Sequence, residues 1–482
     1  MPGDKHATSS AKPVGRHFTA ALPPAPTAEW CATSEPTGYT VGPLGFAMSA
    51  VSEILERIEA ESWDAAVIGL GYVGLPLVAT MARVGIDVTG YDVDPDVVAR
   101  LDAGRSHIDD VSDADLVEIA HKARFTAVAE DLKERDVLFI CVPTPLAVGK
   151  QPDMSYIQQA ARTVGSILRP GQAVILESTT YPGTTQDVVL PILSESGLRI
   201  DEDFLLAYSP ERIDPGNASF RTANIPRIVG GASATSTEAT AHIYRRFVET
   251  VHPLTDARTA EMAKLVENTF RWVNIALANE LASVARAIGV NIWEVIDAAA
   301  TKPFGYMPFY PGPGVGGHCI PLDPFYLQWA ARLTGEGTRF IELAEWVNAR
   351  MPQVVVSHLI QALNSRGVAL RDARILVVGV SYKPNVRDHR ESPALECIRH
   401  LRSWGADVHY IDPLIPELPL DGGIMTALPP TDEVISAADL ILILCDHDAL
   451  DYGLLARSAR LIVDTRNALG RRGITSPNVV LP

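Results

Sequence analysis

Short, mostly apolar segments alternate with longer amphipathic stretches from about residue 65 to the end of the chain. Four such segments cover residues 65–71, 87–92, 135–142 and 173–177, and four more cover 374–379, 407–412, 438–445 and 460–464. Strand-length apolar runs separated by helical patterns are typical of βαβ units with a parallel sheet. Because the two sets follow the same order, we predict an α/β fold with two doubly wound, Rossmann-like domains.

Between the two sets, apolar residues recur at helical spacing, and the pattern rests on Met262, Val266, Val273, Leu277 and Leu281. A helix of ~35 residues would span ~50 Å. Such a helix could join the two domains and present a face to a partner subunit, or it could be a core helix within one domain. The pattern alone is compatible with both arrangements.

The first 50 residues differ from the rest, because they contain seven prolines and no sustained helical or strand period. We therefore expect a flexible N-terminal extension over residues 1–60. The predicted order then continues with a Rossmann domain over 61–254, an all-α region over 255–350 and a second Rossmann-like domain over 351–482.

The composition of the chain argues against several classes of function. The 482 residues have a formal net charge of −17, which argues against a surface for nucleic acid or anionic membranes. The five cysteines are scattered, and no pair has the close spacing of a zinc site, so we expect neither a disulfide framework nor a metal. No apolar run reaches the 18 or so residues of a membrane span. These features predict a cytoplasmic protein.

A glycine-rich motif follows the first predicted strand and consists of Gly69, Leu70, Gly71, Tyr72, Val73 and Gly74. Its glycines could form the tight turn that admits a pyrophosphate to a helix N-terminus. Asp92 ends the next strand, where an acidic residue accepts hydrogen bonds from a ribose. A carboxylate there would repel the 2′-phosphate of NADP, so the motif favours NAD. The alternative is an ordinary βα turn beside a solvated aspartate.

The corresponding turn of the second domain begins at Gly379 and lacks the other glycines, so we do not expect it to bind a second dinucleotide. It offers Lys383, Arg387 and Arg390 instead. These cations suit a different phosphate ligand, although a solvated basic loop would look the same in the sequence.

A loop rich in glycine and proline, residues 311–317, precedes His318 and Cys319. A rigid loop that positions one thiol could present a nucleophile, with Asp323 acting on a water or a proton and His318 as a possible base. A lone cysteine is more often a small buried residue. Within the expected long helix, Lys264 and Asn268 share a face and could stabilise an oxyanion, or they could be solvated surface residues.

Taken together, these motifs resemble the UDP-glucose/GDP-mannose dehydrogenase family over roughly residues 64–470. The matching runs are Val67–Leu75, Val142–Pro145, Glu177–Thr180, Tyr208–Glu211, Glu261–Asn268, Gly316–Cys319, Tyr382–Lys383 and Arg390–Pro393. The resemblance implies an N-terminal NAD domain, a central helical region that forms the core of a homodimer or higher homo-oligomer, and a C-terminal domain that binds the nucleotide diphosphate of a UDP-sugar.

The resemblance also implies a reaction and the residues that perform it. A sugar C6 alcohol would be oxidised twice by hydride transfer to NAD, through a thiohemiacetal and a thioester on Cys319. Lys264 and Asn268 would stabilise the oxyanion, and Asp323, Thr179 and Glu211 would serve proton transfer and hydrolysis. Further residues implied are Thr144 for the cofactor and Lys383, Arg390 and Arg466 for the substrate.

One departure bears on the substrate. Some UDP-glucose dehydrogenases have a second glutamate four residues after Glu211, where this chain has Pro215. The Ser-Pro-Glu-Arg run ending in Pro215-Gly216 resembles enzymes of UDP-N-acetylhexosamines, and residues 302–314 and 339–344 resemble UDP-N-acetylglucosamine 6-dehydrogenases of bacterial surface-polysaccharide synthesis. UDP-N-acetylglucosamine is therefore the expected substrate, with UDP-N-acetylmannosamine, UDP-N-acetylgalactosamine and UDP-glucose as alternatives. A two-electron dehydrogenase and an inactive protein that binds NAD or a UDP-sugar are two further hypotheses.

Overall fold

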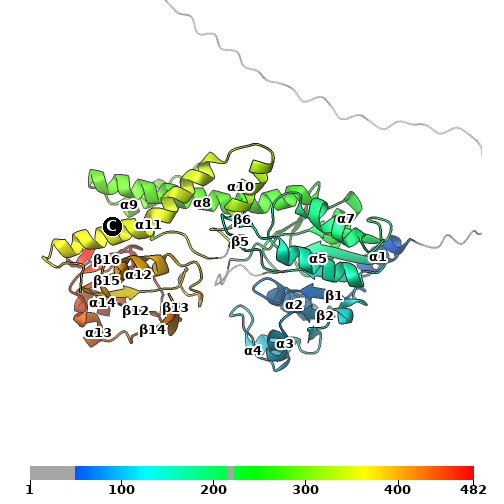
Figure 1. Cartoon of the computed structure of the whole chain (residues 1–482), viewed down its shortest axis with the longest axis horizontal. Helices are drawn as coiled ribbons and strands as arrows, with labels where there is room; N and C mark the ends of the chain where they lie inside the picture. The colour runs from blue at the N-terminus through cyan, green and yellow to red at the C-terminus, as the bar shows by residue number, and fades with distance from the viewer. Residues whose placement is uncertain (1–48, 215–221, 318) are drawn as a thin grey trace, which may run out of the picture. The chain divides into compact units, whose positions relative to one another are not determined.

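The structure of the chain is a computed structural model that describes residues 49–214, 222–317 and 319–482 (Figure 1). Three parts of the sequence-based expectations lie outside the described residues. They are residues 1–48 of the expected extension, Pro215 and Gly216, on which the expected substrate rests, and His318.

The first sheet is mostly parallel and has the strand order β10-β9-β8-β7-β4-β1-β2-β3. Only the β8–β9 pair is antiparallel among its neighbouring strands. The chain builds outward from β1 in both directions, so the sheet has a topological switch point between β1 and β4, where this fold binds ligands. Its strands are β1 (Ala65–Ile68), β2 (Val88–Tyr91), β3 (Ala123–Thr126), β4 (Val137–Ile140), β7 (Gln172–Leu176), β8 (Phe204–Tyr208), β9 (Arg227–Gly231) and β10 (Val251–Pro253).

Helices cover both faces of this sheet, which explains why its central strands are apolar throughout rather than alternating. Along β4, Val137 and Phe139 pack on one face, and Leu138 and Ile140 pack on the other. The elements between the strands are α2 (Gly74–Arg83), α3 (Pro95–Asp102), α4 (Asp113–Ile119), η1 (Ala129–Leu132), the short pair β5 (Leu146–Ala147) and β6 (Gln151–Pro152), α5 (Ser155–Ile167), η2 (Thr185–Val189), α6 (Leu190–Ser194) and α7 (Ala234–Arg245).

Helix α1 (Ala50–Glu59) corrects the expected N-terminal extension, which is wrong for residues 50–59. Ser49 caps this helix through its side chain, and Val51, Ile54 and Ile58 are buried in the core of the first domain. The amphipathic spacing of these three residues was the signal in the sequence. The proline-rich segment before them led to the assignment of residues 50–59 to the extension.

The central region contains the long helix α8 (Ala257–Ile288), which has 32 residues. Asp256 caps its start, and Gly289 ends it in the left-handed conformation. Trp272 and Ala276 of α8 pack against the N-terminal half of α11 (Arg339–Asn364), which lies beside it (Figure 1). The other helices of the region are α9 (Ile292–Ala300) and α10 (Asp323–Leu333).

Four of the five apolar residues that predicted α8 form a stripe on its outer surface, and the fifth, Val273, is partly buried against the cluster around Trp272. Met262, Val266, Leu277 and Leu281 are between 40% and 50% exposed, and Phe270 between them is 47% exposed. A core helix would bury these side chains, so the core-helix interpretation is wrong for this stripe. A face of this kind is suited to another protein surface.

The second sheet is parallel, with the order β12-β11-β15-β16-β17. Val355, Leu359 and Leu363 from the C-terminal half of α11 cover one of its faces, so α11 links the two cores. The elements are β11 (Arg374–Val378), α12 (Pro393–Ser403), β12 (Asp407–Ile411), the hairpin of β13 (Glu417–Leu420) and β14 (Gly423–Thr426), α13 (Asp432–Ala437), β15 (Leu440–Ile443), α14 (Tyr452–Ser458), β16 (Ile462–Asp464), α15 (Ala468–Arg471) and β17 (Val479–Val480).

The two domains share the turn after their first strand. Gly69 has φ +93°, and a Cβ built on it would lie 2.6 Å from the carbonyl oxygen of Cys141. In the second domain, Gly379 approaches Cys445 in the same way, at 2.2 Å. No side chain fits at either place, so the repeat read from the sequence extends to backbone packing.

The acidic residue after the second strand is also repeated, but its surroundings differ. Asp92 accepts from the backbone N–H of Leu70. Asp412 accepts from that of Val380 and additionally binds the imidazole of His447, and both of these side chains are fully buried. A carboxylate enclosed in this way cannot receive a ribose, which supports the expectation that the second domain binds no dinucleotide.

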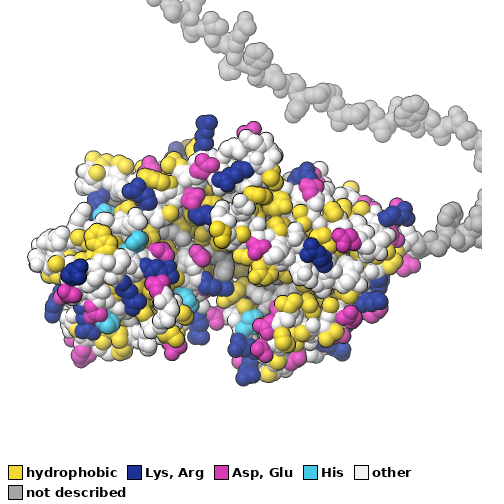
Figure 2. Space-filling view, in the orientation of Figure 1, with side chains coloured by type: hydrophobic (Ala, Val, Ile, Leu, Met, Phe, Trp, Pro, Cys, Tyr) yellow, Lys and Arg dark blue, Asp and Glu magenta, His cyan; other side chains and the backbone are white. Residues whose placement is uncertain are grey.

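The surface carries charges of both signs. On the face shown in Figure 2, Lys and Arg side chains are interspersed with Asp and Glu, so the net charge of −17 forms no uniform acidic surface there. Among the described residues, no helix is both long and apolar enough to cross a membrane. The same residues contain no cluster of His, Cys, Asp or Glu that could hold a metal.

The position of α1 leads to a test of stability. Ile54→Ala removes a side chain that is 1% exposed and should lower the free energy of unfolding by about 2–5 kcal/mol. Urea unfolding followed by circular dichroism measures this difference. The exposed neighbour Glu56→Ala is the control and should have little effect. Equal stability of both variants would contradict the assignment of α1 to the core.

Candidate active site

The motifs of the first domain gather at the carboxyl ends of β1, β4, β7 and β8. Their loops begin at Gly69, Cys141, Glu177 and Ser209. Ser178 links two of them, because its hydroxyl donates to the carbonyl oxygen of Val142 at 2.8 Å. Since β1 and β4 flank the switch point, these loops surround the crevice in which a doubly wound sheet binds its ligand.

The glycine-rich turn provides a cradle that fits a dinucleotide. Gly74 begins α2 so close to Gly69 that a Cβ would overlap the carbonyl oxygen of Gly69, whereas a Cβ on Gly71 would meet no atom within 4 Å. Val73 precedes α2 and makes no side-chain cap, so the positive end of the helix faces this open space. The two carboxylate oxygens of Asp92 accept only from backbone N–H groups in the bonds described, which leaves lone pairs for ribose hydroxyls.

Two threonines predicted from the resemblance lie in neighbouring loops. Thr144 follows β4, and Thr179 follows β7; both are partly exposed. Tyr326 of α10 donates to the carbonyl oxygen of Pro145 at 3.3 Å, which joins the Thr144 loop to the central region. Both threonines therefore border the same crevice as the glycine-rich turn.

Lys264 and Asn268 are buried on one face of α8, with 6% of each side chain exposed. The Lys264 ammonium donates to the carbonyl oxygen of Glu211 at 2.7 Å. The Asn268 amide donates to the carboxylate of Asp323. The interpretation of these two residues as solvated surface is wrong, because they connect α8 to the loop after β8 and to α10.

Cys319 lies in the turn that leads into α10. Its carbonyl oxygen accepts from the backbone N–H groups of Leu322 and Asp323, at 3.1 and 2.9 Å. The residue is exposed at the surface of the chain. Desolvation by the surrounding protein raises the pKa of the Cys319 thiol to about 11; the charge of Asp323 adds to the rise, and that of Lys264 opposes it. Burial also raises the pKa of Asp323, to about 6.

The loop before Cys319 is held by close backbone packing. Gly317 has φ +91°, and a Cβ on it would lie 2.8 Å from the ring of Tyr382 in the C-terminal domain. Gly312 donates its backbone N–H to Asn279 of α8, whose amide donates in turn to Asn348 of α11. The thiol loop is therefore connected to both long helices and to the second Rossmann-like domain.

Asn279 and Asn348 were not recognised from the sequence, and Glu261 was recognised only as part of a matching run. The Glu261 carboxylate accepts from the backbone N–H groups of Gly183 and Thr185, which anchors the segment after Thr179 to α8, and burial raises its pKa to about 7. A signal for Asn279 existed, because it lies eleven residues after Asn268 and so on the same face of the helix. The partners of these side chains come from distant segments, which a sequence pattern cannot reveal.

Glu211 is oriented differently from what the resemblance implies. Its carboxylate points into the protein, where it accepts from Arg227 at 2.6 Å and from the backbone N–H of Ile213 at 2.7 Å. Its carbonyl oxygen, rather than its carboxylate, binds Lys264. A role for the carboxylate in hydrolysis stays a prediction, since the structure shows it engaged elsewhere.

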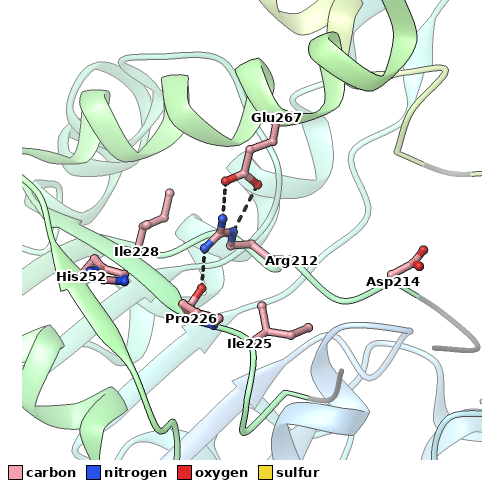
Figure 3. A pocket seen from close by; sticks show the side chains of 7 residues that line it. All are labelled: Arg212, Asp214, Ile225, Pro226, Ile228, His252 and Glu267. Atoms are coloured by element: carbon pink, nitrogen blue, oxygen red, sulfur yellow. Dashed lines mark hydrogen bonds and ion pairs between the residues drawn. The ribbon is translucent and has the colours of Figure 1, made fainter. Parts of the chain in front are cut away.

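A surface pocket lies on the other side of the same segment (Figure 3). Arg212 spans it, with two bonds to the carboxylate of Glu267 on α8 and one to the carbonyl oxygen of Pro226. The remaining lining residues are Asp214, Ile225, Ile228 and His252. Because its arginine is already engaged on both sides, we assign the pocket a structural role in holding residues 211–214.

The three cations predicted to bind substrate occupy different places. Lys383 forms an ion pair with Asp214 at 2.7 Å, which joins the C-terminal domain to the segment after Glu211. Arg390 lies over the ring of Tyr72, 4.7 Å from its centroid, and therefore beside the cofactor cradle.

Arg466 lies beside the thiol loop. A Cβ on Gly312 would come within 2.5 Å of its guanidinium, and its Nε lies 3.5 Å from the carboxylate of Asp446. Of the three cations, Lys383 and Arg466 therefore adjoin the segments that carry Glu211 and Cys319, whereas Arg390 adjoins the glycine-rich turn.

Three family models match the chain in succession, all from the UDP-glucose/GDP-mannose dehydrogenase family. The NAD binding domain matches residues 64–248, the central domain 258–350 and the UDP binding domain 376–471.

Relatives match over most of their own length. A UDP-N-acetyl-D-mannosamine dehydrogenase of Pyrococcus horikoshii is 39% identical over 412 residues, covering 84% of this chain and 95% of the relative. A UDP-N-acetyl-D-glucosamine 6-dehydrogenase of Pseudomonas aeruginosa is 38% identical over 352 residues, covering 73% and 82%. The solved structure of a UDP-D-ManNAc dehydrogenase from Pyrococcus horikoshii has a TM-score of 0.77 at 38% identity and covers 84% of this chain and 96% of its own.

These matches confirm the predicted α/β architecture and NAD as the cofactor. The cradle at Gly71 and Asp92 lies within the matched NAD binding domain, and Lys383 and Arg466 lie within the matched UDP binding domain. The chain belongs to the UDP-glucose/GDP-mannose dehydrogenase family, and it is an NAD-dependent nucleotide-sugar dehydrogenase.

Proposed function

We propose that the protein oxidises the C6 alcohol of a UDP-N-acetylhexosamine to the uronic acid, a four-electron reaction that proceeds through Cys319. The observation that carries the proposal is the convergence of two segments: α8, which carries Lys264 and Asn268, and the turn that carries Cys319 and Asp323. NAD accepts hydride in both oxidation steps. The remaining chemistry is assigned to side chains of this protein.

Cys319 would attack the C6 aldehyde, so that a C–S bond forms while the carbonyl electrons move to oxygen. Lys264 and Asn268 carry N–H donors on one face of α8 and would stabilise that oxygen. Since the pKa of the Cys319 thiol is raised above that of the Asp323 carboxyl, the thiol proton would leave as the C–S bond forms and not before it. We assign the carboxylate of Asp323, which lies in the same turn, as the acceptor of this proton.

Hydrolysis of the thioester would release the acid and regenerate the thiol. Asp323 is held in place by Asn268 and begins α10, so its carboxylate is rigidly positioned. We assign it the activation of water, together with Thr179 from the loop after β7. Glu211 would support this step through the backbone that its carboxylate fixes.

For the substrate we propose UDP-N-acetylglucosamine, the sugar named for the Pseudomonas aeruginosa relative. The name of the Pyrococcus horikoshii relative makes UDP-N-acetylmannosamine the second candidate. Either uronic acid would serve as a precursor for surface polysaccharide. Lys383 and Arg466 would bind the diphosphate, and Arg390 would act between substrate and cofactor, because it lies against Tyr72.

We further propose that the protein is a homodimer formed through α8. The exposed apolar residues of α8 form a stripe with the spacing of a helix-pairing seam. They are Met262, Val266, Phe270, Leu277, Leu281, Val284 and Ile288, and most of them are about half exposed in the single chain. A second copy of the same stripe would bury these side chains. This assignment adopts the interpretation of α8 as a helix that offers a face to a partner subunit.

The stoichiometry of the reaction tests the four-electron proposal. Purified protein should form two NADH for each UDP-N-acetylglucosamine consumed, and Cys319→Ser should lower turnover roughly 10³-fold or more. Cys397→Ala, at a buried cysteine of α12, is the control and should retain activity. One NADH per sugar would contradict the mechanism, and a preference for UDP-glucose in a panel of UDP-sugars would contradict the substrate.

Separate KM values for the UDP-sugar and for NAD test whether Lys383 and Arg466 bind only the UDP-sugar. Lys383→Ala and Arg466→Ala should raise the KM for the UDP-sugar about tenfold or more, because each removes a charged contact, and change the KM for NAD little. Arg460→Ala, at an exposed arginine before β16, serves as the control. Equal increases in both KM values would show that these cations do not distinguish substrate from cofactor.

A charge placed in the apolar stripe tests the homodimer. Leu277→Glu should convert a species of about twice 52.0 kDa into a monomer, as measured by light scattering, without unfolding the chain. Leu277 is half exposed, so the glutamate costs little in the monomer. Val117→Glu is the control: it adds the same charge at an exposed position of α4 and should leave the mass unchanged. A monomeric unaltered protein would refute the proposal.

A further inference from the structure

A fully buried arginine lies beneath the loop that holds Lys264. Arg227 begins β9 and is 1% exposed. One of its terminal nitrogens donates to the carbonyl oxygen of Pro210 at 2.7 Å, and the other donates to the carboxylate of Glu211 at 2.6 Å. The guanidinium therefore binds two consecutive residues of the loop after β8, one through the main chain and one through the side chain.

Both carboxylate oxygens of Glu211 accept hydrogen bonds that hold the side chain in place. One oxygen accepts from the backbone N–H groups of Arg212 and Ile213, at 2.6 and 2.7 Å, and the other accepts from Arg227. These bonds leave the residue little freedom to turn. Its carbonyl oxygen is consequently held in one direction, and that atom accepts from Lys264.

Further buried groups compensate the charge of Arg227. The carboxylate of Glu177 lies 3.3 Å from the guanidinium and accepts from the hydroxyl of Tyr244. The ring of Tyr244 packs against Arg227 with 5.3 Å between the guanidinium carbon and the ring centroid. Burial disfavours the charged guanidinium, but the carboxylates of Glu177 and Glu211 outweigh that cost and keep the pKa of Arg227 raised. The cluster is thus a rigid, charged unit in the core.

We propose that Arg227 is a positioning residue for the oxidation: it fixes the Pro210–Glu211 segment, and the carbonyl oxygen of Glu211 in turn directs the ammonium of Lys264 toward the reacting sugar carbon. This inference rests on the oxyanion role proposed above for Lys264. Arg227 does not reach the substrate itself, because it is buried beneath the loop.

The geometry of the guanidinium explains why this position needs arginine. A planar fork can bind the Pro210 carbonyl and the Glu211 carboxylate at the same time, whereas a lysine amine at the end of a flexible chain is a single point charge. Arg227→Lys keeps the positive charge beside both glutamates and loses the paired contact. It therefore separates the positioning role from the charge.

The first experiment compares Arg227→Lys with a matched control. Arg57→Lys also replaces an arginine that contacts a fully buried carboxylate, that of Asp136, but at the amino end of β4. Arg227→Lys should lower kcat about 10–100-fold, since small displacements of a catalytic group have effects of this size, with both KM values changed less than about threefold. Arg57→Lys should retain its kcat.

The second experiment asks whether Arg227 acts through Lys264. Arg227→Lys, Lys264→Ala and the double variant are compared in single turnovers with enzyme in excess, so that slow NADH formation remains measurable. The double variant should be no slower than Lys264→Ala by more than about twofold, because two residues that act as one unit are not additive. A merely structural role for Arg227 would slow both backgrounds by the same factor.

Each outcome decides a separate point. Full activity of Lys264→Ala would refute the proposed role of Lys264, and normal kcat in Arg227→Lys with an impaired Lys264→Ala would refute this inference alone. Additive losses in the double variant would also overturn it. If Arg227→Lys does not fold, as judged by circular dichroism, the double variant Arg227→Gln/Glu177→Gln removes one charge of each sign and takes its place with the same expected loss.

Discussion

The hydrogen bond from Lys264 to the carbonyl oxygen of Glu211 joins the parts of this protein that must act together. Lys264 belongs to a helix of the central region, and Glu211 belongs to a loop of the first sheet, so this bond, together with those from Arg212 to Glu267, joins the two. Four residues along the same helix, Asn268 holds Asp323 and with it the turn of Cys319. Helix α8 is therefore the common support for the groups to which we assign the roles of nucleophile, oxyanion donors and acid.

Buried polar groups, rather than apolar packing, orient this support. Glu261, Lys264, Asn268 and Asn279 lie along the buried side of α8, and each one binds a different segment of the chain. Apolar contacts between helices tolerate small shifts, whereas a buried amide or carboxylate without its partner costs about 1–3 kcal/mol or more. These buried polar groups therefore define the register of α8 against the loops, and its exposed apolar residues form the face that we propose for a partner subunit.

Local patterns predicted the two Rossmann-like domains, the long helix and the order of the motifs, because strand runs and glycine turns depend on neighbouring residues. The stripe at Met262 and Leu277 predicted α8 correctly, but periodicity could not indicate whether its apolar side lies in the core or outside. The motif residues Lys264, Asn268 and Asp323 do come together. Arg227 was not recognised, since its contacts are with Glu177 and Glu211 in the loops after β7 and β8, and the carboxylate of Glu211 faces that arginine.

The enclosed carboxylate of Asp412 limits how the second domain could be engineered. The turn at Gly379 has the same backbone geometry as the glycine turn of the NAD binding domain. However, the carboxylate of Asp412, at the position where Asp92 would bind a ribose, is bound to His447 and to several backbone N–H groups. Restoring the missing glycines after Gly379 would therefore not create a second dinucleotide site. The turn geometry is shared by both domains, but in the second domain the carboxylate is internal and fixes the loop that carries Lys383 instead of facing a ligand.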